Sequence, residues 1–453
     1  MSKRKFVKIV IALAASFFWA ATVCAEKLYT IAPTDLPNVS REMKTAGYWI
    51  GRIPGPDAVI MGPEAINAFN ENIRENLGSV KDIRMIPDPT DGKALREKLK
   101  AIWNEYKNKN YFSQDDAPAD EAFFDRLLGQ MALESMSERI KPEYGFIVRY
   151  ADQRILPTDE SLYAVAGDID FDELQSNALD AGTPVAVLHR SADQRWLYVL
   201  SESSDGWIKA DKIALSHPAD FDAYLTAPCV VTTSPKADLY LDEALTQFYD
   251  HVQMGAKLPL AATGAADAYA VTLPTADDSG KNQFKVAYVK KDQAAIGYLP
   301  YTPRVMIEQA FKMLNAPYGW GGMHGEQDCS RFLQQVFATV GINLPRNSRD
   351  QARVGRELAK FKEKESLSRK VDRLQKAPAG STLLPMKGHI LLYLGMVGNR
   401  PYAIHATWGY RVPSSEGDAV RVINRVAVTD LYLGEGSQKG SLLDRLNAIL
   451  IVK

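Results

Sequence analysis

The stretch Pro317-Tyr318-Gly319-Trp320-Gly321-Gly322, followed by Asp328-Cys329-Ser330, is the most informative part of this 453-residue chain. After this Gly/aromatic turn, apolar residues recur at helical spacing up to Gly341, an expected C-terminal cap. The pattern predicts a helix over residues 330–340, with Cys329 at its amino end. Unpaired N–H groups and the helix dipole favour an anion there. We therefore expect a reactive thiol whose pKa lies roughly two units below the ordinary value of about 8.5.

A cysteine nucleophile needs a base and a group that orients the base. His389 begins an expected strand over residues 389–394, and His405 lies on the next expected strand, 402–406. The residues between them are rich in turn formers, so the two strands can pair as a hairpin and bring both imidazoles to one face. Two alternatives stay open. One is that His389 is a hydrogen-bonded core residue, and the other is that His324, in the Gly-rich turn, acts as the base instead.

The motifs also resemble a known family. Tyr318 to Gly322, Asp328-Cys329-Ser330, Gly341 to Ser348 and Gly388-His389 match, in order, the motifs of the NlpC/p60 cell-wall peptidases over about 140 C-terminal residues. The resemblance implies a papain-like fold with Cys329 as nucleophile, His389 as base and His405 as the orienting residue. It implies cleavage of γ-D-glutamyl bonds in peptidoglycan stem peptides, with no cofactor and no metal ion.

The chain divides by pattern into five parts. Residues 1–25 read as a signal peptide and 26–140 as a mainly helical segment, with helices expected over 63–77, 91–107 and 123–138. Short strands dominate 141–215 and 216–300, and each set ends in a similar phrase, Gly206-Trp207-Ile208-Lys209 and Gly297-Tyr298-Leu299-Pro300. These phrases resemble the closing strand of bacterial SH3-like (SH3b) domains, so two small β-barrels are expected. In residues 301–453, helices over 303–314, 330–340 and 347–358 precede strands, which indicates an α+β domain.

This order of domains resembles γ-D-glutamyl-L-diamino acid endopeptidases that act on stems with a free N-terminal L-alanine. The resemblance implies that Asp328, Ser330 and Tyr318 bind substrate and that the first SH3b domain narrows the cleft. Asp328 can equally cap the helix, and Tyr318 can simply pack in the turn. Asp159, Glu160 and Tyr163, in an outward-facing loop of the first SH3b domain, are further substrate-binding candidates. Arg331 stands where many family members have Gly; we expect it to point to solvent rather than to support the thiolate.

The N-terminal residues and the composition restrict the expected cellular location and the classes of ligand. A basic start, an apolar run and Val23-Cys24-Ala25 are typical of a cleaved export signal; lipid attachment at Cys24 is the alternative. Removing residues 1–25 changes the formal net charge from −1 to about −5, and there is no basic block suited to nucleic acid. We expect a periplasmic or secreted monomer without a membrane span. Cys229 is expected to be a small buried hydrophobe, although a disulfide with Cys329 is possible in principle.

Peptidoglycan stem peptides or muropeptides are therefore the expected partners. The main alternative is a non-catalytic peptidoglycan-binding or scaffold protein that uses its SH3b domains and has an unreactive Cys329. A third interpretation keeps the fold but changes the reaction to amide or acyl transfer.

Overall fold

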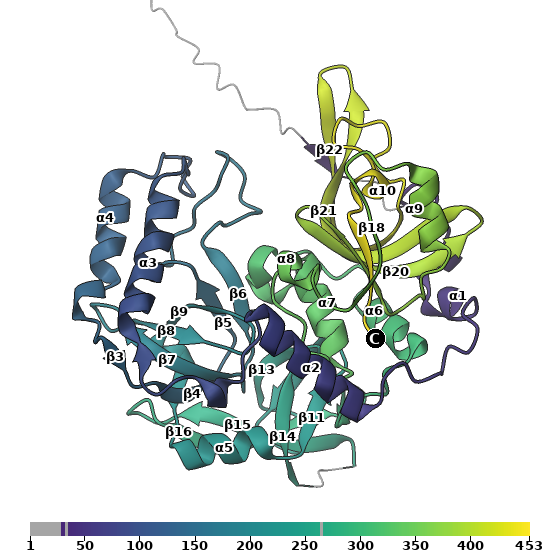
Figure 1. The fold of residues 1–453 in the computed structure, drawn as a ribbon. Coiled ribbons are helices and arrows are strands. Elements are labelled where there is room, and N and C mark those ends of the chain that lie inside the picture. Colours follow the sequence, from purple (N-terminus) through teal and green to yellow (C-terminus); the bar gives the residue numbers. More distant parts are fainter. Residues whose placement is uncertain (1–28, 32–34, 263–265) are drawn as a thin grey trace, which may run out of the picture.

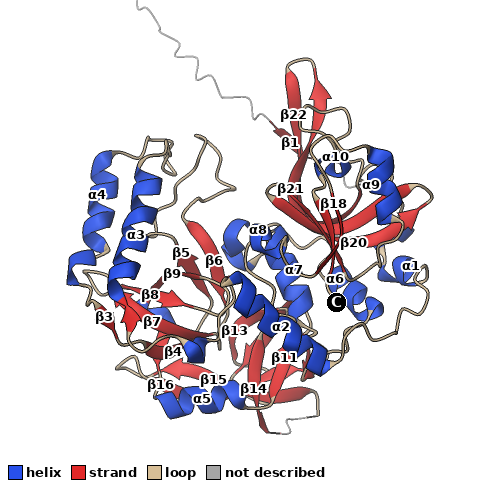
Figure 2. Ribbon diagram, viewed as in Figure 1, coloured by secondary structure: helices blue, strands red, loops and turns tan. Residues whose placement is uncertain are grey.

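The computed structural model describes residues 29–31, 35–262 and 266–453 of the chain. The expected signal peptide, including Cys24, lies outside these residues. Helices combine with three large, mostly antiparallel sheets (Figure 2), which confirms the α+β fold class. Within the described ranges, we find no helix that combines the length and the apolar character needed to span a bilayer.

The C-terminal part of the chain forms a seven-stranded sheet with the order β1-β22-β21-β20-β19-β23-β18. Its strands are β1 (Tyr29–Ile31), β18 (Arg356–Lys360), β19 (Thr382–Met386), β20 (His389–Val397), β21 (Arg400–Ser414), β22 (Gly417–Asp430) and β23 (Ala448–Ile451). Its helices are α6 (Pro303–Lys312), α7 (Cys329–Ala338), α8 (Ser348–Gln351), α9 (Leu367–Leu374) and α10 (Leu442–Arg445). Helix α7 packs on β20 and β21 (Figure 1), because Phe332, Leu333 and Val336 are fully buried in the core of this sheet.

The middle of the chain forms two more seven-stranded sheets. The first has the order β10-β4-β7-β8-β9-β5-β6, with β4 (Glu143–Ile147), β5 (Ala151–Arg154), β6 (Gln175–Leu179), β7 (Pro184–Arg190), β8 (Trp196–Leu200), β9 (Asp205–Lys209) and β10 (Ile213–Leu215). The second has the order β13-β12-β16-β15-β14-β11-β17, with β11 (Cys229–Thr232), β12 (Lys236–Tyr240), β13 (Phe248–Gln253), β14 (Lys257–Ala262), β15 (Ala268–Ala276), β16 (Asn282–Lys290) and β17 (Ala294–Ile296). Helix α5 (Pro218–Thr226) lies between them in sequence.

The two sheets are open rather than closed into the expected barrels. Their edge strands, β10 and β6 in the first and β13 and β17 in the second, do not pair with each other in the described residues. The two similar sequence phrases also differ in structure. Gly206 to Lys209 lies within β9, whereas Gly297 follows the end of β17 and makes only an isolated bridge with Val230.

The N-terminal helices divide between two hydrophobic cores. They are α1 (Ala46–Ile50), α2 (Pro63–Leu77), α3 (Gly92–Lys107) and α4 (Glu121–Gln130), with a small β2 (Thr90–Asp91) and β3 (Arg139–Ile140) pair. Buried residues from Leu36 to Val80 belong to the core of the C-terminal sheet. Buried residues from Ile83 to Met136 share a core with the first middle sheet, beside which α3 and α4 lie in Figure 1. The domain boundaries expected from sequence stay predictions.

Two expected helices are shorter than the sequence indicates. The helix expected over 123–138 ends at Gln130, because the next turn bends so that the Leu133 and Met136 carbonyls accept hydrogen bonds from Arg96. The helix expected over 347–358 ends at Gln351. Gly355 then has a φ of +87°, and the chain enters β18, which pairs with β23. The helices expected over 63–77 and 91–107 are confirmed as α2 and α3.

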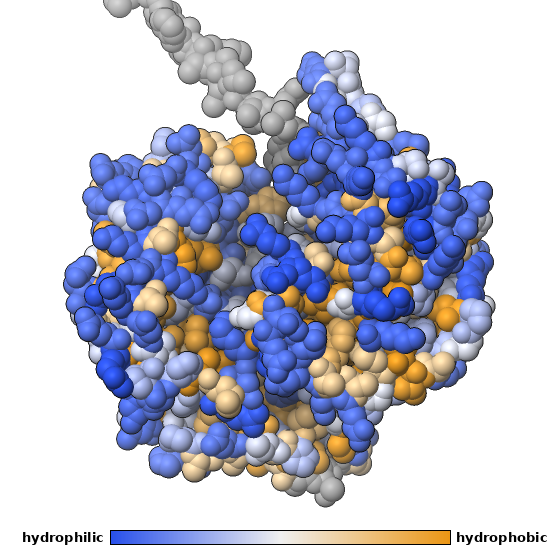
Figure 3. Space-filling view, in the orientation of Figure 1, coloured by the Kyte–Doolittle hydropathy of each residue, from blue (hydrophilic) through white to orange (hydrophobic). Residues whose placement is uncertain are grey.

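The visible face of the molecule is mostly hydrophilic, with apolar residues in separate patches (Figure 3). Two of the exposed large apolar side chains, Val165 (56%) and Ile169 (63%), lie on the long loop between β5 and β6. This loop, residues 155–174, contacts the C-terminal part of the chain, as described next.

Candidate active site

Cys329 is the first residue of α7 and is 7% exposed. Asp328 is the N-cap: one carboxylate oxygen accepts hydrogen bonds from the backbone N–H groups of Ser330 (3.1 Å) and Arg331 (2.8 Å). The capping alternative raised by the sequence is therefore correct for Asp328. The cap directs the amino end of α7, and with it the sulfur, toward the beginning of β20.

His389 and His405 lie on adjacent strands and meet as expected. His389 Nε2 is 2.7 Å from His405 Nδ1, and His405 Nε2 is 2.9 Å from the Thr429 hydroxyl on β22. His405 is 1% exposed, so its ring is fixed by packing as well as by these bonds. Thr429 was not identified from sequence, because its place beside His405 depends on the β21–β22 register, in which Thr429 lies opposite Ala403.

The sulfur and the imidazole pair share one end of the sheet. The backbone N–H of Ile390, the residue after His389, hydrogen bonds to Cys329, and α7 packs against β20 and β21. The structure thus brings Cys329, His389 and His405 into one region. Their catalytic roles stay predictions at this point.

The expected depressed thiol pKa is wrong for this structure. Burial raises the pKa of Cys329 to about 12, and the adjacent Asp328 carboxylate adds to the rise. The Ile390 and Ser330 N–H groups and the Arg346 guanidinium oppose it but do not reverse it. Sequence indicated the helix end correctly; it did not indicate how completely the sulfur is shielded from water.

Burial acts on the two histidines in the opposite direction. It lowers the pKa of His389 to about 3, and the cations of Arg445 and Lys439 contribute, while Asp328 opposes them. Burial and the neighbouring His389 also lower the pKa of His405 well below its usual value. At neutral pH the resting site therefore holds a neutral thiol beside neutral imidazoles.

Arg346 links the nucleophile segment to the first middle sheet. Its guanidinium forms an ion pair with Asp328 (2.7 Å), contacts the Ser330 hydroxyl (3.1 Å) and donates to the Asn177 side chain (2.7 Å). Burial alone would raise the pKa of Asp328, but the charge and hydrogen bonds of Arg346, together with the hydrogen bonds from the Arg331 N–H and Ser330, lower it. Since Asp328 and Ser330 already bond to protein groups, any binding of substrate by them stays a prediction.

The loop between β5 and β6 reaches an aromatic cluster beside the nucleophile. The ring of Phe171 lies 5.3 Å from Trp320, 5.1 Å from Trp408 and 6.4 Å from Tyr318, measured between centroids. The Trp408 indole N–H donates to Asp170 (2.9 Å). Burial, Cys329 and Asp328 raise the pKa of Tyr318, which places this tyrosine beside the sulfur. Asp170, Phe171 and Trp408 were missed from sequence, because they meet only through the fold.

The candidates named in this loop lie elsewhere. Asp159 forms an ion pair with Lys209 (2.8 Å), and Glu160 forms one with Arg126 (2.8 Å). Tyr163, expected to face outward, is 6% exposed and exchanges backbone hydrogen bonds with Phe112. Glu160 thus contacts α4 and Asp159 contacts β9, and the outward placement of Tyr163 is wrong because its backbone pairs with Phe112 and its side chain is buried.

The structure also shows where Arg331, His324 and Cys229 lie. The expectation that Arg331 points to solvent is wrong: its guanidinium donates to Gln253 (2.8 Å) and pairs with Asp180 (3.4 Å), because both middle sheets cover this face of α7. His324 is exposed and lines a shallow hollow with Tyr150 and His251. Cys229 is half-buried rather than buried, and neither cysteine among the described residues forms a disulfide.

Two cationic side chains, Arg445 and Lys439, lie close enough to His389 to lower its pKa, and Arg411 lies near both of them. Arg445 donates to the Lys387 carbonyl (3.5 Å), two residues before His389. The loop of residues 434–440 folds over β21 at Arg411, since a Cβ on Gly434 would lie 3.4 Å from the Arg411 carbonyl oxygen. Burial, Arg445 and Arg411 lower the pKa of Lys439, so the three cations lie close enough to repel one another. Across the described ranges, no carboxylate pairs with Arg411, Lys439 or Arg445 within 4.0 Å.

In the part of the chain that the structure describes, no three His, Cys, Asp or Glu side chains gather as a metal site.

Comparisons with known proteins give the class of the chain. The NlpC/P60 family model matches residues 315–416, and the model of an SH3 domain of the SH3b1 type matches residues 162–209. The chain therefore carries an NlpC/P60 domain and an SH3b domain.

Two curated relatives are both called gamma-D-glutamyl-L-lysine dipeptidyl-peptidase. The one from Bacillus cereus is 26% identical over 44% of this chain and 58% of its own length. The one from Bacillus subtilis is 32% identical over 15% of this chain and 23% of its own length. The matched region thus spans less than two thirds of either relative.

A solved structure described as a novel NlpC/P60 endopeptidase from Photobacterium damselae subsp. piscicida has the same overall fold. It superposes with a TM-score of 0.75 at 20% identity and covers 94% of this chain and 99% of that one. At this identity the likeness concerns the fold alone.

Proposed function

We propose that the protein is an exported cell-wall cysteine peptidase that hydrolyses the γ-D-glutamyl-L-diamino acid bond of peptidoglycan stem peptides. The observation that carries the proposal is the sequence of contacts from Cys329 through β20 to His389, His405 and Thr429. The names of the two curated relatives support the bond and the class of substrate. Export rests on the basic and apolar N-terminal residues, and a monomer is the state we propose.

The neutral resting site determines how the nucleophile forms. For His389 to act as base, its Nε2–H donates to His405 Nδ1, and His405 Nε2–H donates to Thr429. The other ring nitrogen of His389 is then free to take the proton from Cys329 as the sulfur attacks the carbonyl carbon. The Cys329 N–H at the helix end stabilises the oxyanion. The imidazolium protonates the leaving amine, and the acyl-enzyme is hydrolysed by a water that His389 activates.

The loop between β5 and β6 supplies the proposed site for the free N-terminal amine. Burial raises the pKa of Asp168, and repulsion by the Asp170 carboxylate contributes to the rise. An ammonium group placed between two nearby carboxylates relieves that repulsion. Asp170 also holds Trp408, which lies three residues after His405 on β21. We therefore assign the ammonium to Asp168 and Asp170 rather than to Asp328, whose charge Arg346 already balances.

The cations near His389 suggest the chemistry of the leaving residue. His389 must contact the leaving amine, so the diamino acid that carries this amine lies on the His389 side of the cleft. Arg445 and Lys439 lie on that side, Arg411 lies near both, and among the described residues no carboxylate pairs with any of the three. We propose that they favour a diamino acid with a second carboxylate, such as diaminopimelate, over lysine.

The decisive test is hydrolysis of the synthetic stems L-Ala-γ-D-Glu-meso-diaminopimelate and L-Ala-γ-D-Glu-L-Lys. The native chain should release L-Ala-γ-D-Glu from both, and Cys329→Ala should lower kcat by at least about 10⁴-fold. Asp170→Asn should reduce kcat/KM for free-amine stems about tenfold but leave an N-acetylated stem unaffected. Undiminished turnover by Cys329→Ala would refute the assignment.

The raised thiol pKa gives a separate prediction. Below its pKa, the thiolate fraction of Cys329 increases tenfold for each pH unit, so alkylation by iodoacetamide should rise continuously from pH 7 to 10. Mass spectrometry can follow Cys329 apart from Cys229. A plateau near neutral pH would instead mean that the resting site holds a thiolate–imidazolium pair.

The same raised pKa favours one alternative, a non-catalytic peptidoglycan-binding protein that uses its SH3b domains. That protein would sediment with intact sacculi and leave both stems uncleaved. Hydrolysis separates the two functions, whereas alkylation alone does not.

A further inference from the structure

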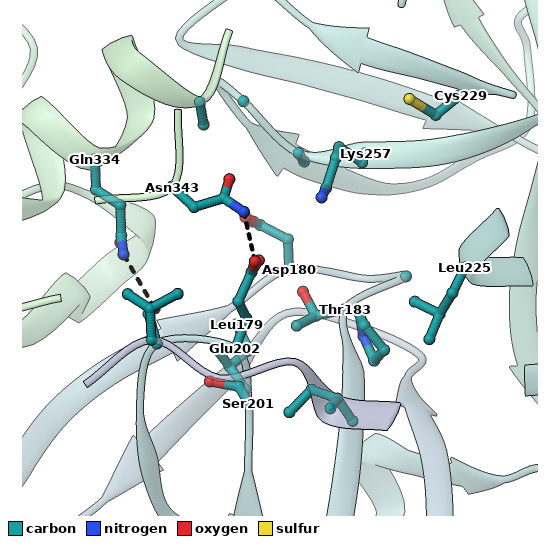
Figure 4. Close-up of a pocket in the computed structure, with 18 of the residues that line it drawn as sticks. Leu179, Asp180, Thr183, Ser201, Glu202, Leu225, Cys229, Lys257, Gln334 and Asn343 are labelled. Carbon is teal, nitrogen blue, oxygen red and sulfur yellow. Dashed lines mark hydrogen bonds between the residues drawn. The ribbon is translucent and has the colours of Figure 1, made fainter. Parts of the chain in front are cut away.

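A second cavity lies behind α7, away from the sulfur. Its volume is about 510 Å³, within the range of roughly 300–1,000 Å³ usual for small-molecule sites. Its lining includes the segment after α2, the turns at 179–184 and 201–203 of the first middle sheet, and the end of α5. The starts of β11 and β14 in the second middle sheet, the outer face of α7 and residues 342–344 complete most of the wall. Figure 4 shows Lys257 extending its amino group into this space opposite Ser201 and Glu202.

The charges that line the cavity leave a surplus cation. Arg331 pairs with Asp180 (3.4 Å), and Arg84 pairs with Asp82 (2.7 Å). The Glu202 carboxylate accepts a hydrogen bond from Asn343 (2.5 Å). Its charge also raises the pKa of Lys257, which keeps this lysine protonated. In the described residues neither Lys257 nor Lys81 has a carboxylate within ion-pair distance, so the lining can accept an anion.

We propose that this cavity is a second binding site, for a short peptide that carries a free carboxylate. Lys257, whose amino group extends into the cavity, binds the carboxylate. The site is distinct from the catalytic cleft, because it lies on the face of α7 formed by Arg331, Gln334, Gln335 and Ala338 rather than at Cys329. Only the choice of probe below rests on the proposed function.

Arg331 connects the two sites. It lines the cavity and is two residues from Cys329, and its N–H bonds to the Asp328 cap. A carboxylate in the cavity competes with Asp180 for Arg331. An occupied cavity therefore changes the support of the first turn of α7, and acidic peptide fragments would regulate the nucleophile.

Cys229 gives a direct readout, because it lines the cavity and is half-buried. In a full chain with Cys24→Ser and Cys329→Ala, it is the only thiol. The probe is L-Ala-γ-D-Glu, and the measurement is the rate of Cys229 labelling by an aromatic disulfide. At a probe concentration ten times its Kd, labelling should slow about tenfold, because the unoccupied fraction falls in that proportion.

Three comparisons make the result decisive. Lys257→Met should abolish protection, whereas Lys285→Met, an exposed lysine on β16 outside the cavity, should leave it intact. Phe171→Ala, in the catalytic cleft, should also retain protection. Equal labelling with and without the dipeptide, equal protection by its diamide, which lacks both carboxylates, or protection that survives Lys257→Met would overturn the proposal. Because Cys329 is absent, the outcome does not depend on whether the native chain cleaves stem peptides.

Discussion

The two middle sheets contact the segment around the nucleophile, residues 317–346, in different ways. The first sheet brings Asn177 to Arg346 and, through its long loop, Asp170 and Phe171 to the aromatic cluster beside the sulfur. The second sheet reaches the segment mainly through Gln253, which donates to the Gly325 carbonyl (2.7 Å) and accepts from Arg331 (2.8 Å). One sheet contributes groups that can touch substrate, and the other fixes the backbone that leads to the nucleophile.

This difference teaches that two sheets of equal strand number can have unequal functions. The family model for SH3b domains matches only residues 162–209, which include part of the loop over the cleft. The second sheet instead buries Gln253 (1% exposed) and pairs Lys236 with Glu326. We therefore expect substitutions in the first sheet to change catalysis and those in the second to change mainly stability.

The largest effect should come from substituting the glycine where the nucleophile segment meets the first sheet, Gly321, or the glycine where the second sheet meets α7, Gly255. A Cβ on Gly321 would lie 2.5 Å from the Gln175 carbonyl oxygen, at a φ of +59°. Gly321→Ala should lower the free energy of unfolding by about 2–4 kcal/mol and kcat/KM by about 100-fold, since the nucleophile segment moves. Gly255→Ala is the matched variant, because its Cβ would lie 2.5 Å from Ala338 at the back of α7. It should lose similar stability in urea unfolding, but its kcat/KM should fall less than about tenfold. A larger loss of kcat/KM in Gly255→Ala than in Gly321→Ala would contradict the distinction between the two sheets.

The next effect concerns the aromatic cluster. Phe171→Ala removes ring contacts with Trp320 and Trp408. Because the β5–β6 loop then loses its anchor over the cleft, KM for free-amine stems should rise about tenfold, with kcat less affected. Phe248→Ala, a 57% exposed phenylalanine on the second sheet, is the control and should leave both constants unchanged. Equal effects of the two variants would remove the distinction between the sheets.

The smallest effect should follow from breaking an ion pair of the second sheet. Lys236 lies 2.6 Å from Glu326, and the lysine side chain is 37% exposed. Because water screens such a pair, Lys236→Met should cost no more than about 1 kcal/mol in thermal unfolding, and less still at high salt. A large loss of kcat/KM would show that the second sheet also acts on catalysis.

Local patterns in the sequence predicted much of the site. Apolar spacing after Cys329 predicted α7, and the turn formers between the His389 and His405 strands predicted the hairpin that joins their rings. The thiol pKa could not be predicted, because a helix end lowers it while burial and Asp328 raise it, and only the fold determines which effect is larger. Asp170 and Phe171 were missed for a related reason: more than 140 residues separate them from Cys329, and no local period marks such a contact.

The neutral, shielded sulfur of Cys329 has a consequence for its chemical lifetime. Peroxides and disulfides react with thiolates far faster than with protonated thiols, and a buried group is reached less often. If the chain acts outside the reducing cytosol, as proposed, a permanently ionised sulfur would be consumed by oxidation between substrates. In the proposed mechanism the sulfur ionises only once a peptide is bound, which exchanges some readiness for durability.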